Sequence, residues 1–229
     1  MKLSVIIPVY NEAATIEKII ARVAAVPMET EIIVVDDGST DGTTERVRAL
    51  MAGRDESCLR VLFHEKNCGK GAAIITGLRH VTGEVVTIQD ADLEYHPEDY
   101  PLAVRLIADG YADAVFGSRF LGPHRVFMFW HYAGNKLLTL LLNVLFNSTL
   151  TDMETGFKLI RHEALRELNI RSRGFDFEPE VTAKLLKRKY RIYEIPITYT
   201  GRTYDEGKKI TWRDGLRALW AILKFRVCD

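Results

Sequence analysis

Cysteine, long apolar runs and net charge are all scarce in this chain of 229 residues. Cys58, Cys68 and Cys228 are odd in number and lack the spacing of metal ligands, which argues against a disulfide framework and predicts reduced thiols in a cytoplasmic protein. No signal-peptide pattern follows Met1. The apolar stretch 137–151 contains two asparagines and a serine, and it is shorter than the roughly 18 residues of a membrane-spanning helix. These absences argue against a membrane span, but not against attachment to a membrane surface.

The formal net charge is zero, yet the two signs are unevenly distributed. Residues 1–118 carry 11 Lys or Arg against 19 Asp or Glu, whereas residues 119–229 carry 20 against 12. An acidic half suits a metal ion and a basic half suits an anionic ligand, although solvated surfaces can give the same asymmetry. This balance gives no reason to expect a nucleic-acid partner.

Apolar runs of strand length alternate with helical patterns through the first half of the chain. This alternation predicts an α/β fold with a mainly parallel sheet and helices on both faces. After Gly117 it weakens, and we expect a loop over 119–135 before the remaining elements. The expected strands are 3–9, 31–35, 59–63, 85–88, 112–116, 157–160 and 192–197, and the expected helices are 12–25, 43–51, 70–80, one from Pro97, 136–146, 179–189 and 212–225.

Two carboxylates, Asp90 and Asp92, follow the expected strand 85–88. In extended chain, side chains two residues apart point the same way, and Mg²⁺ is held by one or two carboxylates together with substrate phosphates. The pair is a weak signal by itself, because aspartate is also common in solvated turns and helix caps.

Other polar segments also follow expected strands. In open parallel sheets, ligands bind beyond the carboxyl ends of the strands, and this rule selects residues 8–12, 36–41, 67–70 and 90–94. Asp36 and Asp37 could accept hydrogen bonds from a nucleobase or ribose. Lys70 lies in a glycine-rich turn that lacks the complete phosphate-loop pattern, but its ammonium could still neutralise a phosphate.

Several motifs occur together, in order and spacing. They are SVIIPVYNE at 4–12, VVDDGSTDG at 34–42, DAD at 90–92 and GSRF at 117–120. In this combination the chain resembles a family 2 glycosyltransferase of the GT-A fold. TDMETGFK at 151–158, EIPI at 194–197 and GRTYDEGKK at 201–209 are similar to the branch that contains dolichyl-phosphate mannose synthase and the polyprenyl-phosphate glycosyltransferases. The resemblance implies a single GT-A (Rossmann-like) domain over 1–229, with a nucleotide-sugar-binding half at 1–118 and an acceptor-side half at 119–229.

The same resemblance implies roles for individual residues. Asp90 and Asp92 would bind Mg²⁺ or Mn²⁺. The residues that would hold the nucleotide sugar are Pro8, Tyr10, Glu12, Asp37, Lys70, Asp90, Ala91, Asp92 and Glu94. The residues that would hold the acceptor phosphate are Arg119, Arg125, Arg202 and Lys208. Catalysis would depend on Asp92, Arg119, Arg202 and Lys208. The chain departs from the family over 127–135, so Arg125 or His131 would have to supply the grip on the acceptor instead.

The implied reaction is the inverting, metal-dependent transfer of a hexose from a nucleotide sugar of the GDP-mannose or UDP-glucose type to a polyprenyl or dolichyl phosphate. A phosphate acceptor is already ionised near neutral pH and needs no general base, whereas a hydroxyl acceptor needs a carboxylate or histidine. The basic second half favours phosphate, but Asp152, Glu154 and Asp176 keep a sugar hydroxyl, as in polysaccharide or glycan synthesis, open as an alternative. A non-catalytic nucleotide-sugar-binding subunit is a third interpretation, which the intact Asp90 and Asp92 pair disfavours.

The last expected helix carries Trp212, Leu216, Leu219, Trp220 and Leu223 on one face, with basic residues nearby. Such a face suits an anionic membrane surface, and it equally suits a protein core. We therefore expect a cytoplasmic protein that is peripheral at the inner face of the cell membrane. A membrane-anchored partner or a second copy of the chain would be a further partner.

Overall fold

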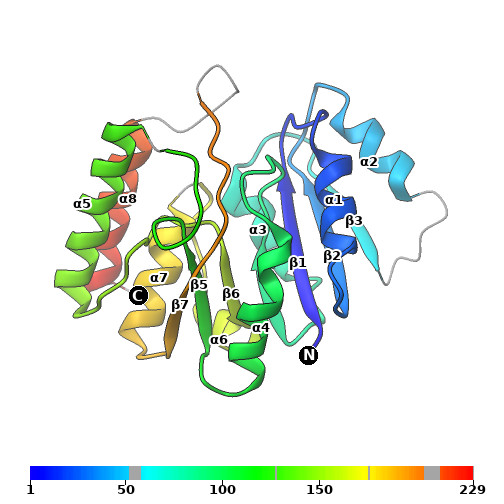
Figure 1. Cartoon of the computed structure of the whole chain (residues 1–229). Helices are drawn as coiled ribbons and strands as arrows, with labels where there is room; N and C mark the ends of the chain where they lie inside the picture. Colours follow the sequence, from blue (N-terminus) through cyan, green and yellow to red (C-terminus); the bar gives the residue numbers. More distant parts are fainter. Residues whose placement is uncertain (52–57, 127, 175, 204–211, 229) are drawn as a thin grey trace.

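A computed structural model describes residues 1–229 except 52–57, 127, 175, 204–211 and 229 (Figure 1). In the described part, one 7-stranded sheet runs through the molecule in the order β3-β2-β1-β4-β6-β5-β7. Its strands are β1 (Leu3–Val9), β2 (Thr30–Asp36), β3 (Leu59–Phe63), β4 (Val85–Ile88), β5 (Ala114–Ser118), β6 (Lys158–Arg161) and β7 (Ile192–Pro196). β6 is antiparallel to both of its neighbours, and the other pairs are parallel. The predicted mainly parallel sheet is therefore confirmed.

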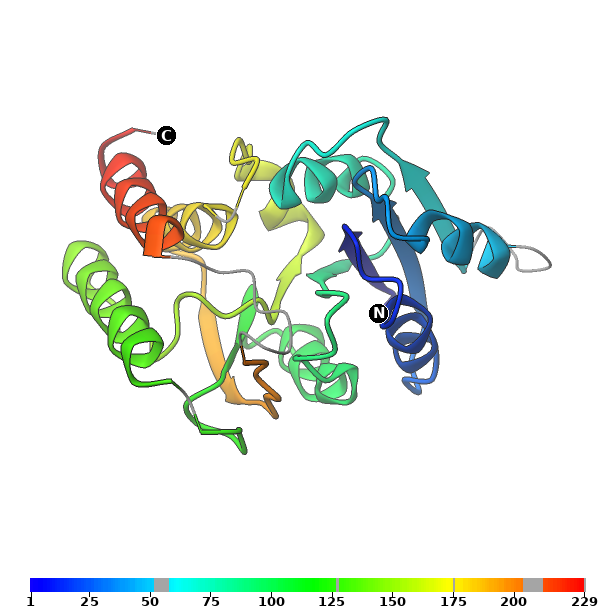
Figure 2. The same cartoon turned by 90° about the horizontal axis from the view of Figure 1, so that it is seen from above.

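Helices cover both faces of this sheet, as the alternating pattern predicts (Figure 2). One core lies under α1 (Ile16–Ala24), α2 (Thr43–Met51) and α4 (Tyr100–Ala108), which follows the short 3-10 turn η1 (Pro97–Asp99). The opposite core lies under α3 (Lys70–Leu78), α5 (Phe129–Phe146), α6 (His162–Glu167), α7 (Phe177–Lys187) and α8 (Trp212–Val227). Strands between two such layers are buried on both sides, which explains the continuous apolar run of β1.

The expected loop over 119–135 is wrong in its second part, because α5 begins at Phe129. Leu138, Leu141, Leu142 and Leu145 recur at helical spacing and pack on the core that α5 shares with its neighbours α7 and α8. That packing stabilises the helix as a whole. Once it has formed, the first turn of α5 can extend it toward the N-terminus, although the aromatic side chains of that turn remain exposed. The short helix α6 is also absent from the sequence-based prediction.

α5 and α8 lie side by side at the edge of the molecule that is remote from β3 (Figures 1 and 2). Neither they nor any other helix among the described residues combines the length and the apolarity that crossing a membrane requires.

Candidate functional site

The polar segments after β1, β2, β4 and β5 meet at one edge of the sheet, because parallel strands end on the same side. Residues from two of these segments, those after β1 and β4, are connected through Arg202 and Lys70. Arg202 contacts Glu12 beyond β1 and Asp92 beyond β4, and Lys70 contacts Asp90. Glu12, Asp90 and Asp92, which the sequence analysis selected because they follow strands, therefore lie close together in the structure.

The turn after β4 holds its carboxylates in a strained conformation. Leu93 has a φ of 64°, a left-handed conformation that is rare for a leucine. The Glu94 N–H donates to Asp92 Oδ1 over 3.1 Å, and Ala91 is buried in the core. The left-handed residue reverses the chain so that Asp90, Asp92 and Glu94 stay close together. Strain of this kind is found at functional sites where the surrounding packing maintains it.

Arg202 lies among the carboxylates of this turn. Its Nη2 donates to Asp92 Oδ2 over 2.9 Å, its backbone N–H donates to Glu94 Oε1 over 2.9 Å, and its Nη1 lies 3.8 Å from Glu12 Oε2. Glu94 also accepts a hydrogen bond from the Tyr199 hydroxyl. Arg202 was expected to face phosphates, and in this structure its guanidinium neutralises the acidic turn.

The acidic turn fits a divalent metal ion. Burial and the nearby charges of Asp90 and Glu94 raise the pKa of Asp92 to about 7, although Arg202 opposes the shift. Three carboxylates that repel each other are stabilised by a bound cation, and their oxygen atoms are the ligands that Mg²⁺ and Mn²⁺ prefer. Asp90 and Asp92 are therefore the residues that would hold the ion.

Lys70 joins this turn to α7. Its Nζ lies 2.8 Å from Asp90 Oδ1 and 2.9 Å from Glu178 Oε1. Burial alone would lower the pKa of Lys70, but the two carboxylates raise it well above its ordinary value. The ammonium is thus charged and fixed beside the Asp-x-Asp pair. Glu178 was missed by sequence reasoning because nothing in the chain links it to a lysine 108 residues away.

Arg119, directly after β5, is held by Asp152. Its Nε and Nη2 each donate to one Asp152 oxygen over 2.7 Å, and its backbone N–H donates to Oδ2 over 3.1 Å. The guanidinium also stacks over the Tyr199 ring at 5.4 Å. Burial opposes ionisation of Asp152, but Arg119 keeps its pKa below the ordinary value. Asp152 is consequently a permanent partner of Arg119 and unsuited to act as a general base.

Glu154 differs from Asp152 in this respect. Its Oε1 is buried without a hydrogen-bond partner in the described part of the chain. Burial and the charge of Glu178 raise the pKa of Glu154 to about 7. A carboxylate with a pKa near the working pH has the property required of a general base.

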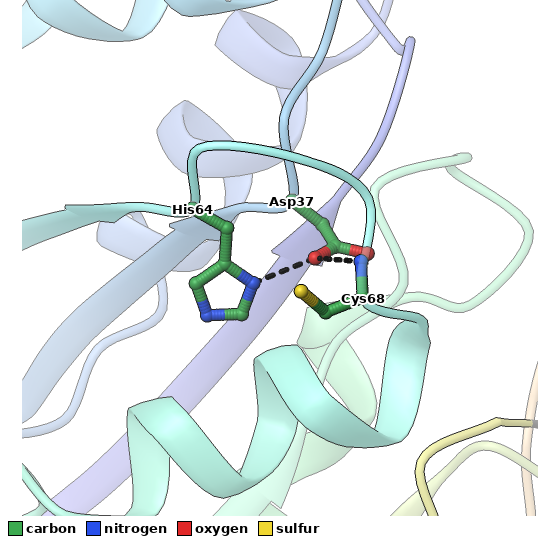
Figure 3. Close-up of side chains that lie close together, drawn as sticks. All are labelled: Asp37, His64 and Cys68. Atoms are coloured by element: carbon green, nitrogen blue, oxygen red, sulfur yellow. Dashed lines mark hydrogen bonds and ion pairs between the residues drawn. The ribbon is translucent and has the colours of Figure 1, made fainter.

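Asp37, at the end of β2, is bound by the loop before α3 (Figure 3). Its Oδ1 accepts hydrogen bonds from the Cys68 N–H over 2.9 Å and from His64 Nδ1 over 2.6 Å, and its Oδ2 accepts from the Gly69 N–H over 2.8 Å. Asp36 instead stabilises the turn into α2 by accepting from the Ser39 N–H. Of these two aspartates, Asp37 is the one whose carboxylate lies against a histidine and a cysteine.

The remaining predicted residues lie in different surroundings. Pro8 is half-buried in β1, and Tyr10 is 39% exposed just beyond it. Arg125 is exposed and its backbone N–H donates to the Tyr199 carbonyl over 3.2 Å. Lys208 lies outside the described residues.

Comparison with known proteins identifies relatives over the whole chain. The model of the family Glycosyl transferase family 2 matches residues 4–168. A dolichol-phosphate mannosyltransferase of Pyrococcus furiosus is 31% identical over 217 residues, which are 91% of this chain and 59% of that protein. An undecaprenyl-phosphate mannosyltransferase of Micrococcus luteus is 29% identical, with 99% of both chains covered.

Solved structures show the same fold. A glucosyl-3-phosphoglycerate synthase of Mycobacterium tuberculosis, crystallised with Mn²⁺, uridine diphosphate and glucosyl-3-phosphoglycerate, superposes with a TM-score of 0.76 at 23% identity. The superposition covers 100% of this chain and 81% of that one. The expected fold and enzyme class are therefore confirmed: the chain belongs to glycosyl transferase family 2 and has the GT-A fold.

Proposed function

We propose that this enzyme transfers a hexose, with inversion, from a nucleotide sugar to a polyprenyl phosphate. The observation that carries the proposal is the acidic turn at the sheet edge, where Asp90 and Asp92 lie beside Arg202 and Lys70. Relatives whose names specify dolichol phosphate and undecaprenyl phosphate as acceptors support the choice of acceptor.

The donor would lie along the ends of β1, β2 and β4. Pro8, Tyr10, Glu12 and Asp37 would hold the nucleoside, and the segment from Asp90 to Glu94, together with Lys70, would hold the ribose and diphosphate. A divalent cation on Asp90 and Asp92 would stabilise the negative charge that develops on the leaving diphosphate.

The acceptor phosphate would meet the cations on the other side of the acidic turn. An oxygen of the phosphate attacks the anomeric carbon from the face opposite the diphosphate, and the bond between that carbon and the diphosphate breaks, which inverts the configuration. Arg119, Arg125, Arg202 and Lys208 would orient the acceptor and compensate its charge. The phosphate is already ionised near neutral pH, so the reaction needs no general base.

A membrane surface is the proposed location of the acceptor. Leu137, Leu140 and Val144 of α5 are between 59% and 72% exposed, and Leu216, Trp220 and Leu223 of α8 are between 43% and 68% exposed. We call these six residues the α5–α8 apolar surface. Arg217 and Lys224 lie on the same helix α8 and are exposed. An exposed apolar surface with basic residues is typical of helices that lie in an anionic membrane interface.

Replacing two leucines of the α5–α8 apolar surface by glutamate is expected to weaken membrane association. Each buried leucine contributes about 1.5–3 kcal/mol, so L137E/L216E should bind anionic phosphatidylglycerol vesicles at least about tenfold more weakly in a sedimentation assay. L102E on α4, where Leu102 is 50% exposed on the opposite layer, is the matched control. Equal loss in both variants would contradict the proposed surface.

The proposed reaction is tested by incubating the enzyme with labelled nucleotide sugars, short polyprenyl phosphate and Mg²⁺ or Mn²⁺. Label in the lipid extract that depends on the polyprenyl phosphate is the expected result. Label that enters only a water-soluble glycan would instead support transfer to a hydroxyl, and bound nucleotide without any turnover would support a non-catalytic subunit.

Glu154 favours the hydroxyl acceptor as a second candidate, because its pKa of about 7 suits a general base. E154Q distinguishes the two reactions. Transfer to polyprenyl phosphate should remain within about threefold of the wild type, whereas a base-dependent transfer to a hydroxyl should fall by about 10²–10⁴-fold. A large loss of lipid product in E154Q would therefore contradict the phosphate mechanism.

The same variant has an expected effect on stability. Because the pKa of Glu154 in the folded state lies above the ordinary 4.5, the folded wild type loses stability as the pH rises from about 4.5 to 7. E154Q should therefore be more stable than the wild type by about 1–3 kcal/mol at pH 8 and should lose this advantage at pH 4.5. Chemical denaturation at both pH values measures it, with E29Q as an exposed control.

A further inference from the structure

Asp37, His64 and Cys68 bring an oxygen, a nitrogen and a sulfur ligand atom together beyond the end of β2. These atoms all lie within 4.8 Å of one another. The three side chains come from separate points of the chain, at the end of β2, directly after β3 and just before α3. Figure 3 shows the Cys68 sulfur on the side of the imidazole that faces the Asp37 carboxylate.

Hydrogen bonds around the cluster fix two of its three ligands. The backbone N–H groups of Cys68 and Gly69 orient the Asp37 carboxylate. His64 Nε2 lies 2.9 Å from Thr76 Oγ1 on α3, so this hydroxyl can accept a hydrogen bond from Nε2–H. In that tautomer Nδ1, which otherwise donates to Asp37, carries a lone pair that a metal can bind. Such outer partners set the tautomer and orientation of histidines that bind metals.

We propose that Asp37, His64 and Cys68 form a binding site for Zn²⁺ or a similar borderline-soft cation. Thiolate and imidazole ligands select such ions over Mg²⁺, and three protein ligands leave the fourth tetrahedral position for water or a substrate group. His64 Nδ1 and Asp37 Oδ1 are now 2.6 Å apart. Zinc bonds of about 2.0–2.1 Å at a tetrahedral angle place two ligand atoms about 3.3 Å apart, so the imidazole would have to rotate slightly when the metal binds.

This site is different from the acidic turn that we propose for Mg²⁺ or Mn²⁺. The turn after β4 offers only carboxylates and lies against Arg202 and Lys70, whereas the cluster at β2 includes a thiol and an imidazole. Hard and soft divalent cations would therefore bind at separate places, with opposite consequences for the enzyme.

Zinc at this site would inhibit the enzyme by competing with the donor. This consequence rests on the proposed function, in which Asp37 holds the nucleoside. A cation that takes up the Asp37 carboxylate removes the hydrogen-bond acceptor that the nucleoside needs. Zinc and nucleotide would then bind the free enzyme in a mutually exclusive manner.

Cobalt spectroscopy tests the site without any measurement of activity. Titration of the reduced protein with Co²⁺ should produce an ultraviolet thiolate-to-cobalt charge-transfer band and visible bands of tetrahedral cobalt, and one equivalent of Zn²⁺ should remove them. C68S should lose the charge-transfer band and bind Zn²⁺ at least about tenfold more weakly, since loss even of an outer-shell partner costs that much. C58S and C228S, at the other exposed cysteines, should keep the band. A band that is absent, or that survives in C68S, would overturn the site.

Competition is then measured separately from metal binding. The affinity for uridine and guanosine diphosphates should fall when Zn²⁺ is present in wild type, and C68S should need at least about tenfold more Zn²⁺ for the same fall. Inhibition of transfer by Zn²⁺ should show the same dependence on Cys68. Nucleotide affinity that is unchanged by Zn²⁺ in wild type would overturn the competition. A cobalt spectrum in a protein that transfers no sugar would refute the proposed function and leave the metal site intact.

Discussion

Replacing Asp92 by asparagine is expected to lower metal-dependent turnover by about 10³-fold, equivalent to about 4 kcal/mol of transition-state stabilisation. Asp92 supplies one of the two charged oxygen ligands proposed for the ion, and the neutral amide of asparagine binds a hard cation weakly. Initial rates of lipid-product formation across a Mn²⁺ titration measure the loss. Isothermal titration with Mn²⁺ should show weakened binding in the same variant.

An inactive D92N could also result from loss of the fold. The stability of the metal-free variant distinguishes this explanation from loss of the metal. Asp92 is crowded by Asp90 and Glu94, so removing its charge should leave the thermal unfolding temperature of the metal-free protein unchanged or raise it. D109N at the exposed end of α4 is the matched control and should behave as wild type. Full activity of D92N after treatment with a chelator would refute the metal role.

The sheet could be predicted from the sequence because most of its strands are short apolar runs, the pattern expected of strands buried on both faces. β1, β3 and β4 occupy the expected residues, since a short apolar run between turn signals has few other stable conformations. The early start of α5 could not be predicted in this way. Its first turn carries exposed aromatic side chains, and the side chains that contact the core, among them Leu138, Leu141 and Leu142, come later in the helix.

The location of the candidate site was predictable from the sequence, and its side-chain pairings were less so. The position of Asp90 and Asp92 after a buried strand places them at the carboxyl edge of the sheet, because parallel strands end at a common edge, and their role as metal ligands stays a prediction. The pairing of Arg119 with Asp152, 33 residues away, and that of Lys70 with Glu178 depend on how β6 and α7 pack. The raised pKa of Glu154 likewise results from burial and from Glu178, neither of which is visible in the local sequence.

Arg202 is expected to have opposite effects on metal binding and on catalysis. R202A should lower the rate constant for transfer to polyprenyl phosphate by about 10²–10³-fold, the usual loss when one charge-stabilising donor is removed. The same variant should bind Mn²⁺ as tightly as wild type or more tightly, because Asp92 and Glu94 no longer share their oxygens with a guanidinium. Titration with Mn²⁺ and steady-state kinetics with saturating metal measure the two effects separately.

A merely structural role for Arg202 would give a different combination of results. If the guanidinium only neutralised the acidic turn, excess Mn²⁺ would replace its charge and restore the rate of R202A. If it orients phosphates, saturating metal leaves the rate low, and R202K recovers only part of it because lysine lacks the planar donor fork. R105A on α4 removes an arginine whose side chain is 79% exposed and should change neither quantity. Recovery of R202A by metal would therefore withdraw Arg202 from the acceptor site and leave Arg119, Arg125 and Lys208 as its proposed cations.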